Sequence, residues 1–381
     1  MELSAEDLLR LNVLLANKIE AIRIDDQAMS VHGLAGEHEA TLHLNPNCRP
    51  DQYLRRVREL LSSHVLGSPG GYPVFLQRWT RMGQTKHGSL DKLLLLGEPE
   101  AVVAVAGAPD LTDELARRVW WIQPTADIAR RMLQRPAVVA GTMGKTLAAY
   151  LIEHLPFETD PLTVITTVRL VLQPGLVDAD TRLRIWRRGD HRNAYHIGFL
   201  EAIPQQLPDP IPARADHAAT QDRLRALAEQ GNPIADKLER VLASEGQTFV
   251  ATCEPLLEHP VNNDAAAALL NAIGRYFRSL APELSTSRDI AAILARAHDI
   301  EAVAPAAAVI REIPELRPTL VAARVLAQAD EQLIIEILAK TSAAGTLLRR
   351  KLDAVVTPLL QQCAVLRGRP VSTATGRRRP R

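Results

Sequence analysis

The sequence predicts a mostly α-helical protein: an irregular, α-solenoid-like helical array with a small N-terminal α+β segment. Three observations predict this fold. Aromatic residues make up only 4% of the 381 residues, whereas hydrophobic residues make up 46%. Amphipathic segments separated by Pro or Gly follow one another along most of the chain. Such a composition disfavours large sheets, and segments this short become stable only when they stack on their neighbours.

Residues 1–85 form the predicted α+β region. Ser4 is a predicted N-cap, and the leucines that follow it at helical spacing predict a helix that ends near Ala16. Three short alternating segments, at residues 21–25, 28–33 and 39–44, predict a small β-meander or hairpin. A further helix is expected from Asp51, as its N-cap, to Gly67.

Two helical regions follow, at residues 86–203 and 217–366. Residues 112–122 and 125–134 resemble one another, because each begins with a Thr cap and continues with an Ala-Arg-Arg core. Between the two regions, the Pro-rich residues 204–216 predict a linker or long loop. Residues 367–381 predict a disordered basic tail.

Charge and cysteine usage exclude several classes of protein. The chain carries 45 Lys and Arg against 44 Asp and Glu, so no net field attracts nucleic acid or an anionic membrane. The apolar runs are much shorter than the roughly 20 residues of a membrane span, and no signal peptide is evident. Cys48, Cys253 and Cys363 are scattered without CxxC spacing. We therefore expect a cytoplasmic protein with neither disulfides, a metal site nor a cofactor.

Residues 140–146 read AGTMGKT, and the Gly-Lys-Thr at their end is typical of a nucleotide-binding P-loop. A P-loop also requires Gly five residues before Gly144, and that position holds Val139. No clear strand precedes the segment. Lys145 and Thr146 are therefore predicted to lie in a helix that ends near His154.

Residues 182–196 concentrate Arg around aromatic side chains and contain our candidate anion- or partner-binding residues: Arg184, Trp186, Arg187, Arg188 and Arg192. Arg beside an aromatic ring suits acidic proteins or phosphates. The simpler interpretation is a solvated helix face, followed by a Gly turn, with Trp186 packed inward. The sequence favours this interpretation.

Two other segments are candidates for binding. His32, His38 and His43, close to Cys48, could share one face of the predicted β region, but they lack the tight pairs typical of zinc ligands. The loop GSPGGYP at residues 67–73 could approach a ligand closely, together with residues 78–82 of a helix expected at 74–84. The simpler interpretation of this loop is a turn before an amphipathic helix.

Residues 44–84 and 90–121, and the string YLIEHLPFETDP at 150–161, resemble the sulfur reduction protein DsrS family. The resemblance covers most of the chain except the basic tail. It implies a cytoplasmic role linked to the dissimilatory sulfite reductase system, which oxidises stored sulfur in sulfur bacteria. It carries no established reaction, cofactor or catalytic residue onto these positions.

Three functions therefore follow as expectations. The first is a non-enzymatic accessory protein that binds protein partners of the sulfur-oxidation machinery through a helical face. The second is a sulfur carrier or sulfur-handling enzyme that uses Cys48, which has Arg49 as its basic neighbour. The third is a regulatory protein that binds nucleic acid through residues 182–192 or the tail, although the near-zero net charge makes nucleic acid the less favoured partner.

Overall fold

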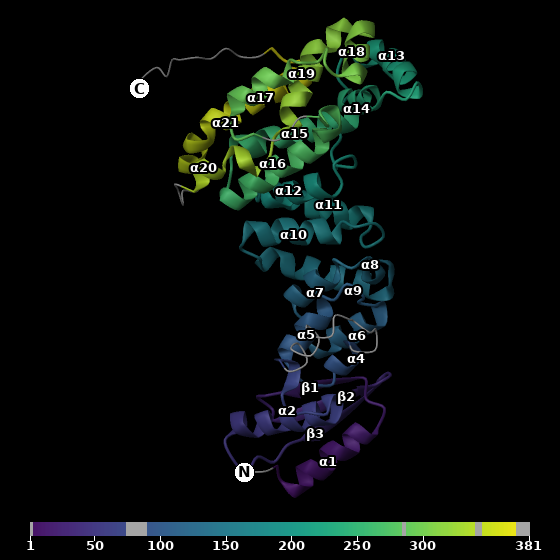
Figure 1. Cartoon of the computed structure of the whole chain (residues 1–381), viewed down its shortest axis with the longest axis vertical. Helices are drawn as coiled ribbons and strands as arrows, with labels where there is room; N and C mark the ends of the chain where they lie inside the picture. The colour runs from purple at the N-terminus through teal and green to yellow at the C-terminus, as the bar shows by residue number, and fades with distance from the viewer. Residues whose placement is uncertain (1–2, 74–89, 284–286, 340–344, 371–381) are drawn as a thin grey trace. The chain divides into compact units, whose positions relative to one another are not determined.

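The computed structural model describes residues 3–73, 90–283, 287–339 and 345–370. They form a mostly α-helical fold with one small antiparallel sheet near the N-terminus (Figure 1). Contacts divide the chain into two compact units. Unit 1 comprises Met1–Pro156 and Gln173–Val177, and unit 2 comprises Phe157–Leu172 and Asp178–Arg381.

Unit 1 begins with α1, three strands and α2. Its elements are α1 (Ala5–Ala16), β1 (Ala21–Asp25), β2 (Ser30–Ala35), β3 (His38–His43), α2 (Pro50–Leu66), α4 (Leu90–Leu93), α5 (Pro99–Ala106), α6 (Asp113–Ile122), α7 (Ala126–Met132), α8 (Pro136–Ala140) and α9 (Thr142–His154). The short 3-10 helix η2 (Leu155–Phe157) lies at the boundary along the chain.

The elements predicted between residues 4 and 67 are confirmed, with small shifts in their bounds. The Ser4 hydroxyl caps α1 by accepting a hydrogen bond from the Asp7 backbone N–H. The second and third strands lie within two residues of their predicted positions. Asp51 is in the first turn of α2 instead of at its N-cap, because Pro50 takes the first helical position and Arg49 becomes the cap. Residues 74–84 lie outside the described residues.

The sheet has the order β1-β2-β3, with Arg23 opposite His32 and His32 opposite Thr41. Helices α1 and α2 cover one face of it, where Leu11, Val31 and Tyr53 share a core. On the other face, the Arg23 guanidinium lies 4.8 Å from the ring centroid of Trp121 in α6. The sheet is therefore packed on both faces within unit 1.

Asp7 is the one fully buried carboxylate of this core in the described part of the chain. It accepts hydrogen bonds from the Tyr53 hydroxyl and from the Asn45 backbone N–H, at 2.8 Å for the latter. A buried polar group needs such partners, since an unpaired one is costly. The network joins α1, α2 and the loop after β3.

Unit 2 contains the remaining helices. They are α10 (Pro161–Val171), α11 (Ala179–Arg187), η3 (Arg188–Asp190), α12 (Ala194–Ala202), α13 (His217–Glu229), α14 (Pro233–Leu242), α15 (Ser244–Glu258), α16 (Asn263–Phe277), η4 (Arg278–Leu280), α17 (Ile290–Ala297), α18 (Ala304–Glu312), η5 (Pro314–Leu316), α19 (Arg317–Leu326), η6 (Glu331–Leu333), α20 (Ile335–Leu338) and α21 (Gly345–Leu366).

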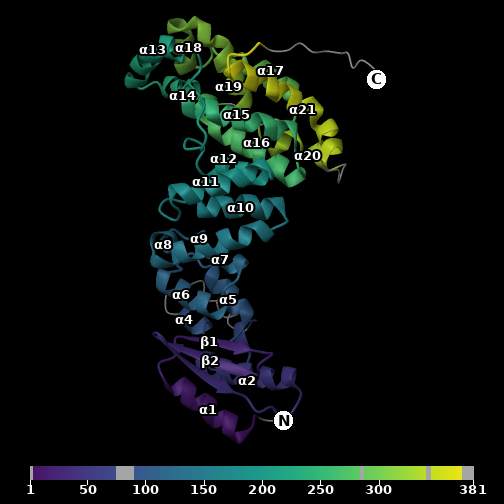
Figure 2. The same ribbon diagram turned by 180° about the vertical axis from the view of Figure 1, so that it is seen from behind.

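Neighbouring helices pack on one another within unit 2. Helix α14 contacts α13 and α15, and α15 contacts α16 and α21 (Figures 1 and 2). Asp, Asn or Thr caps and first-turn prolines begin many of the helices in both units, as at Asp160 and Pro161 of α10. None of the described helices is long and apolar enough to cross a bilayer.

The Pro-rich residues 204–216 lie inside unit 2, and the division between units falls near Pro156 instead. Hydrogen bonds hold this segment against later helices. The Ile211 backbone N–H donates to Thr248 Oγ1 at 3.0 Å, and the Arg214 N–H donates to the Leu242 carbonyl at 2.9 Å. A Pro-rich segment that is anchored in this way is part of the packed unit and does not separate two helical regions.

Candidate partner-binding site

Three arginines predicted from the sequence share one exposed face of α11 and η3. Arg184, Arg187 and Arg188 are all exposed, and their spacing of three and four residues places them on one side of the helix. Arg184 donates a hydrogen bond to Thr181 Oγ1 at 2.8 Å. The side chains of Arg187 and Arg188 make no hydrogen bond or ion pair with any part of the chain that the structure describes. Their donors therefore face solvent.

Trp186 points the opposite way and anchors α11. Only 6% of its surface is exposed. Its indole N–H donates to Asp209 Oδ2 at 3.0 Å, and its ring centroid lies 4.2 Å from that of His196 and 5.0 Å from that of Phe199. Trp186 therefore packs inward and offers no surface to a partner. Its burial fixes the rotation of α11 and so keeps the arginines outside.

Asp209 completes the anchor and comes from the Pro-rich segment. It lies between Pro208 and Pro210 and adopts a left-handed conformation with φ 57, which aspartate tolerates better than most residues do. The sequence does not reveal this role, because the two partners are 23 residues apart and nothing local marks the pair. Asp209 was absent from our candidates for this reason.

Arg192 is separated from the other arginines. Its guanidinium donates to the Glu158 carbonyl at 2.6 Å and lies 5.7 Å from the ring centroid of Tyr195. Arg192 is half-buried, and these contacts hold α12 to the start of unit 2. Of the five predicted residues, three form an exposed basic face and two are structural.

Local contacts also shift the pKa values of two titratable groups near this face, Asp178 and His196. Hydrogen bonds from Thr181 lower the pKa of Asp178, the N-cap of α11. Burial lowers the pKa of His196, against the opposite influence of Asp190 and Asp209, and its Nε2 atom is buried without a hydrogen-bond partner. The neutral imidazole suits its position against Trp186. The lowered pKa keeps Asp178 ionised near Arg184, so this carboxylate offsets part of the positive charge of the face.

The three cysteines differ in accessibility. Cys253 and Cys363 are buried, and burial raises the pKa of both thiols, that of Cys363 to about 12. Cys48 lies just before α2 and is half-buried, and its Sγ is 3.7 Å from the Arg49 carbonyl oxygen. Cys48 is thus the most accessible of the three thiols.

The Gly-Lys-Thr segment lies in α9, as predicted, and a carboxylate occupies the helix N-terminus where a P-loop would bind phosphate. Asp113 of α6 accepts hydrogen bonds from Thr142 N, Thr142 Oγ1 and Met143 N at 2.9, 2.7 and 3.0 Å. A Cβ at Gly141 would collide with the Asp113 carboxylate. Asp113 therefore acts as a cap from a distant helix and blocks anion binding at this point.

We expect Asp113→Ala to lower the free energy of unfolding of unit 1 by about 1–2 kcal/mol, as the loss of an N-cap does. Burial acts to raise the pKa of Asp113, but the hydrogen bonds from Thr142 and Met143 outweigh it and lower the pKa below 3.8. The stabilisation that the ionised Asp113 carboxylate gives is complete at pH values above the pKa of Asp113 in the unfolded chain. It is lost as pH falls through the lower pKa of Asp113 in the folded protein. Urea unfolding at neutral pH and at pH values below that pKa measures it.

The control for Asp113 is Glu153→Ala, which removes an exposed carboxylate from α9. That change should leave the urea midpoint nearly unaltered at both pH values. A destabilisation by Asp113→Ala that does not diminish in acid would contradict the proposed capping role of the ionised carboxylate.

The histidines near Cys48 do not converge on one point. His32 Nδ1 lies 2.9 Å from Glu39 Oε1, and its Nε2 bonds Ser30 Oγ at 2.9 Å. His38 and His43 lie at opposite ends of β3. The described residues contain no group of three His, Cys, Asp or Glu side chains that could hold a metal ion.

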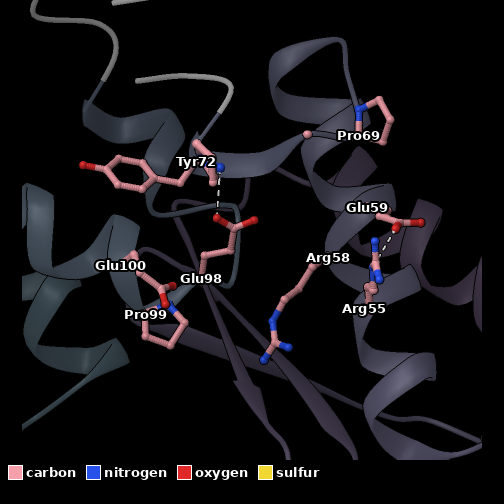
Figure 3. Close-up of a pocket in the computed structure, with 10 residues that line it drawn as sticks. Arg55, Arg58, Glu59, Pro69, Tyr72, Glu98, Pro99 and Glu100 are labelled. Atoms are coloured by element: carbon pink, nitrogen blue, oxygen red, sulfur yellow. Dashed lines mark hydrogen bonds and ion pairs between the residues drawn. The ribbon is translucent and has the colours of Figure 1, made fainter. Parts of the chain in front are cut away.

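The Gly-rich loop borders a pocket of about 670 Å³ in unit 1 (Figure 3). Glu98 accepts a hydrogen bond from the Tyr72 backbone N–H at 2.9 Å, and Arg55 Nε lies 3.2 Å from Glu59 Oε1. Arg58 donates to the Gly97 carbonyl. Most charges of the described lining residues are thus already paired, and these residues offer no nucleophile beside a base. Residues 78–82, which we expected to contribute, lie outside the described residues.

No protein-family model, curated protein or solved structure matches this chain. The fold and the site define a helical protein with an exposed basic face.

Proposed function

We propose that this protein is a non-enzymatic accessory protein of cytoplasmic sulfur oxidation, and that the face formed by Arg184, Arg187 and Arg188 binds an acidic protein partner. The process rests on the resemblance to the DsrS family. The observation that supports docking is the exposed set of arginine donors on a helix that the buried Trp186 holds in place. Guanidinium groups favour carboxylates, and arginines on a helix that is already formed lose less backbone entropy on binding than arginines on an unfolded segment would.

The near-zero net charge favours protein over nucleic acid as the partner. Tight nucleic-acid binding needs many phosphate contacts, and three arginines on a chain of net charge +1 supply few. An acidic protein surface needs only local complementarity, which speeds encounter and selects the partner.

The test measures binding of purified proteins of the dissimilatory sulfite reductase system to the immobilised chain at low and physiological ionic strength. Arg184→Glu, Arg187→Glu and Arg188→Glu are combined in one variant. We expect it to weaken binding by at least about tenfold at low salt, since reversed charges repel an acidic partner. Arg311→Glu, Arg349→Glu and Arg350→Glu make the matched control elsewhere in unit 2, with the same change in net charge.

Three outcomes would overturn this proposal. The first is that none of these proteins binds, and the second is that both variants bind equally well. The third is that the chain binds short duplex DNA with a salt slope that the first variant reduces, which would favour the nucleic-acid function.

The sulfur-carrier alternative is favoured by the accessibility of Cys48. In that function the thiolate would hold a persulfide, and docking would be secondary. A stable persulfide on Cys48 in the purified protein, absent from Cys48→Ser and retained in the charge-reversed variant, would replace the docking proposal with this alternative.

A further inference from the structure

The third strand of unit 1, β3, forms a free edge of the small sheet. In the described part of the chain, the order β1-β2-β3 leaves one side of β3 without a neighbouring strand. All residues of β3 are exposed except Leu42, which is half-buried. An edge strand presents a row of backbone donors and acceptors that can pair with a strand of another chain.

The hydrogen bonds of the sheet show which residues of β3 point outward. Along an antiparallel strand, successive residues alternate between bonding the neighbouring strand and facing away from it. The Leu44 backbone N–H donates to the Met29 carbonyl at 2.8 Å, so the even-numbered residues of β3 bond β2. The backbone groups of Glu39, Thr41 and His43 therefore face away from β2. They make no hydrogen bond with the described part of the chain.

These three residues are complementary to a second copy of themselves. When two copies of β3 pair antiparallel about a two-fold axis at Thr41, the two Thr41 residues lie opposite each other. Glu39 of each copy then lies opposite His43 of the other, and every outward-facing backbone group of the three residues has a partner. A carboxylate opposite a hydrogen-bond donor stabilises an antiparallel pair. A register centred on Glu39 would instead place two carboxylates opposite each other.

Glu39 is held in place for this contact. Its Oε1 accepts a hydrogen bond from Arg23 Nη2 at 3.0 Å and lies 2.9 Å from His32 Nδ1. Its Oε2 accepts one from the Trp121 indole N–H at 3.2 Å. A carboxylate oxygen has two lone pairs, so Oε2 can accept a second hydrogen bond. The side chain of His43 makes no hydrogen bond or ion pair with the described residues and can supply it.

Exposed apolar side chains on α1 point to the same partner. Helix α1 packs against β3 (Figure 1). Its Leu8, Leu9 and Val13 are 40%, 65% and 57% exposed. Apolar side chains that gather in this way indicate an interaction surface. A two-fold axis at the sheet edge runs perpendicular to the sheet, so both copies of α1 lie on the same face of the joined sheet. Their apolar side chains can then pack against each other.

We propose that β3 is the docking surface for a second copy of this chain, and that the protein forms a two-fold dimer with one continuous antiparallel sheet. Natural edges that avoid pairing carry Pro, Lys or a bulge. Residues 38–43, all of which the structure describes, contain neither Pro nor Lys, and their register with β2 has no bulge. This interface uses other residues than the proposed binding of an acidic partner does.

The experiment measures the mass of the full chain by sedimentation velocity from low to high micromolar concentration. We expect a dimer whose fraction rises with concentration. Thr41→Pro removes the outward-facing N–H at the axis and should abolish the dimer. The fold should remain, because Pro is tolerated where the N–H of an edge strand faces solvent, and circular dichroism checks this. Thr41→Val keeps the N–H and should still form the dimer.

Charge reversal and cross-linking test the register. His43→Glu places a carboxylate opposite Glu39 and should weaken the dimer by at least about tenfold at low salt. His38→Glu makes the same change in charge on the other face of the sheet and should weaken it less. Thr41→Cys should form an intermolecular disulfide at the axis. His38→Cys should not, because the two copies of residue 38 lie at opposite ends of the paired strands.

The contribution of α1 has its own pair of variants. Leu9→Gln should weaken the dimer, whereas Leu347→Gln, at a leucine that is 54% exposed in α21, should not. Equal affinities of these two variants would overturn the part assigned to α1.

Two results would overturn the dimer itself. A chain that stays monomeric over the whole concentration range would leave an extended segment of another protein as the occupant of the edge. A dimer that Thr41→Pro and His43→Glu both leave intact would show that β3 is not the interface. If Thr41→Pro loses its fold, His43→Glu and the disulfide of Thr41→Cys decide the question.

Discussion

Arg324→Met is expected to lower the free energy of unfolding of unit 2 by about 2–3 kcal/mol, because it leaves the Ala297 and Asp299 carbonyls without their buried donor. The Arg324 side chain is 1% exposed, and its Nη1 lies 2.7 Å from Glu283 Oε1. That distance makes an ion pair, although Nη1 has no hydrogen-bond partner of good geometry. Its Nε donates to the Ala297 carbonyl at 3.1 Å, at the C-terminus of α17.

The methionine variant fills a similar volume but leaves that helix terminus without a buried donor and Glu283 without its cation. Glu283→Gln should cost less than Arg324→Met, since the Glu283 side chain is 34% exposed and solvent screens its charge. Urea denaturation followed by circular dichroism measures both changes.

Helix α19 supplies the matched control. Its first residue, Arg317, pairs with Glu301 at 2.6 Å, but the two side chains are 43% and 67% exposed. Arg317→Met should therefore cost less than about 1 kcal/mol. Similar losses from Arg317→Met and Arg324→Met would show that burial does not determine the strength of the pair.

Gly274→Ala is expected to cost about 3 kcal/mol, at the upper end of the usual range for overpacking a core. Gly274 is buried in α16, and a Cβ there would collide with the backbone carbonyl oxygen of Ala329, after α19. A backbone atom cannot rotate away as a side chain can, so α16 and the segment after α19 would have to separate.

Gly107→Ala is the control for this second change. Gly107 has φ −92, and the nearest atom to a Cβ there would be the Val103 carbonyl oxygen at 3.6 Å. Alanine fits without displacement, so the urea midpoint should stay the same or rise slightly. A Gly274→Ala variant as stable as the unmodified protein would show that α16 can shift at no cost.

Local sequence signals predicted most of the secondary structure. The Thr112 and Thr125 caps, with the repeated pattern after each, correctly marked α6 and α7. Lys145 and Thr146 were correctly predicted to lie in a helix that ends near His154, which is α9. These features depend on caps, proline positions and hydrophobic periodicity, which act over a few residues.

The candidate site was predicted only in part. The arginine-rich segment was recognisable because its residues are adjacent, but the inward position of Trp186 depends on Asp209 and His196 from other elements. Asp209 is 23 residues away from Trp186 along the chain. Pairings across such distances leave no local pattern.

The sequence by itself thus determined a mostly α-helical chain with a small sheet, near-zero net charge and an arginine-rich helix. The tertiary structure decided which arginines remain exposed, that Asp113 occupies the N-terminus of α9, and that residues 204–216 belong to unit 2. The physical reason is the range of the forces involved. Helices form from contacts between near neighbours, whereas burial and the pairing of charges depend on which helices pack together.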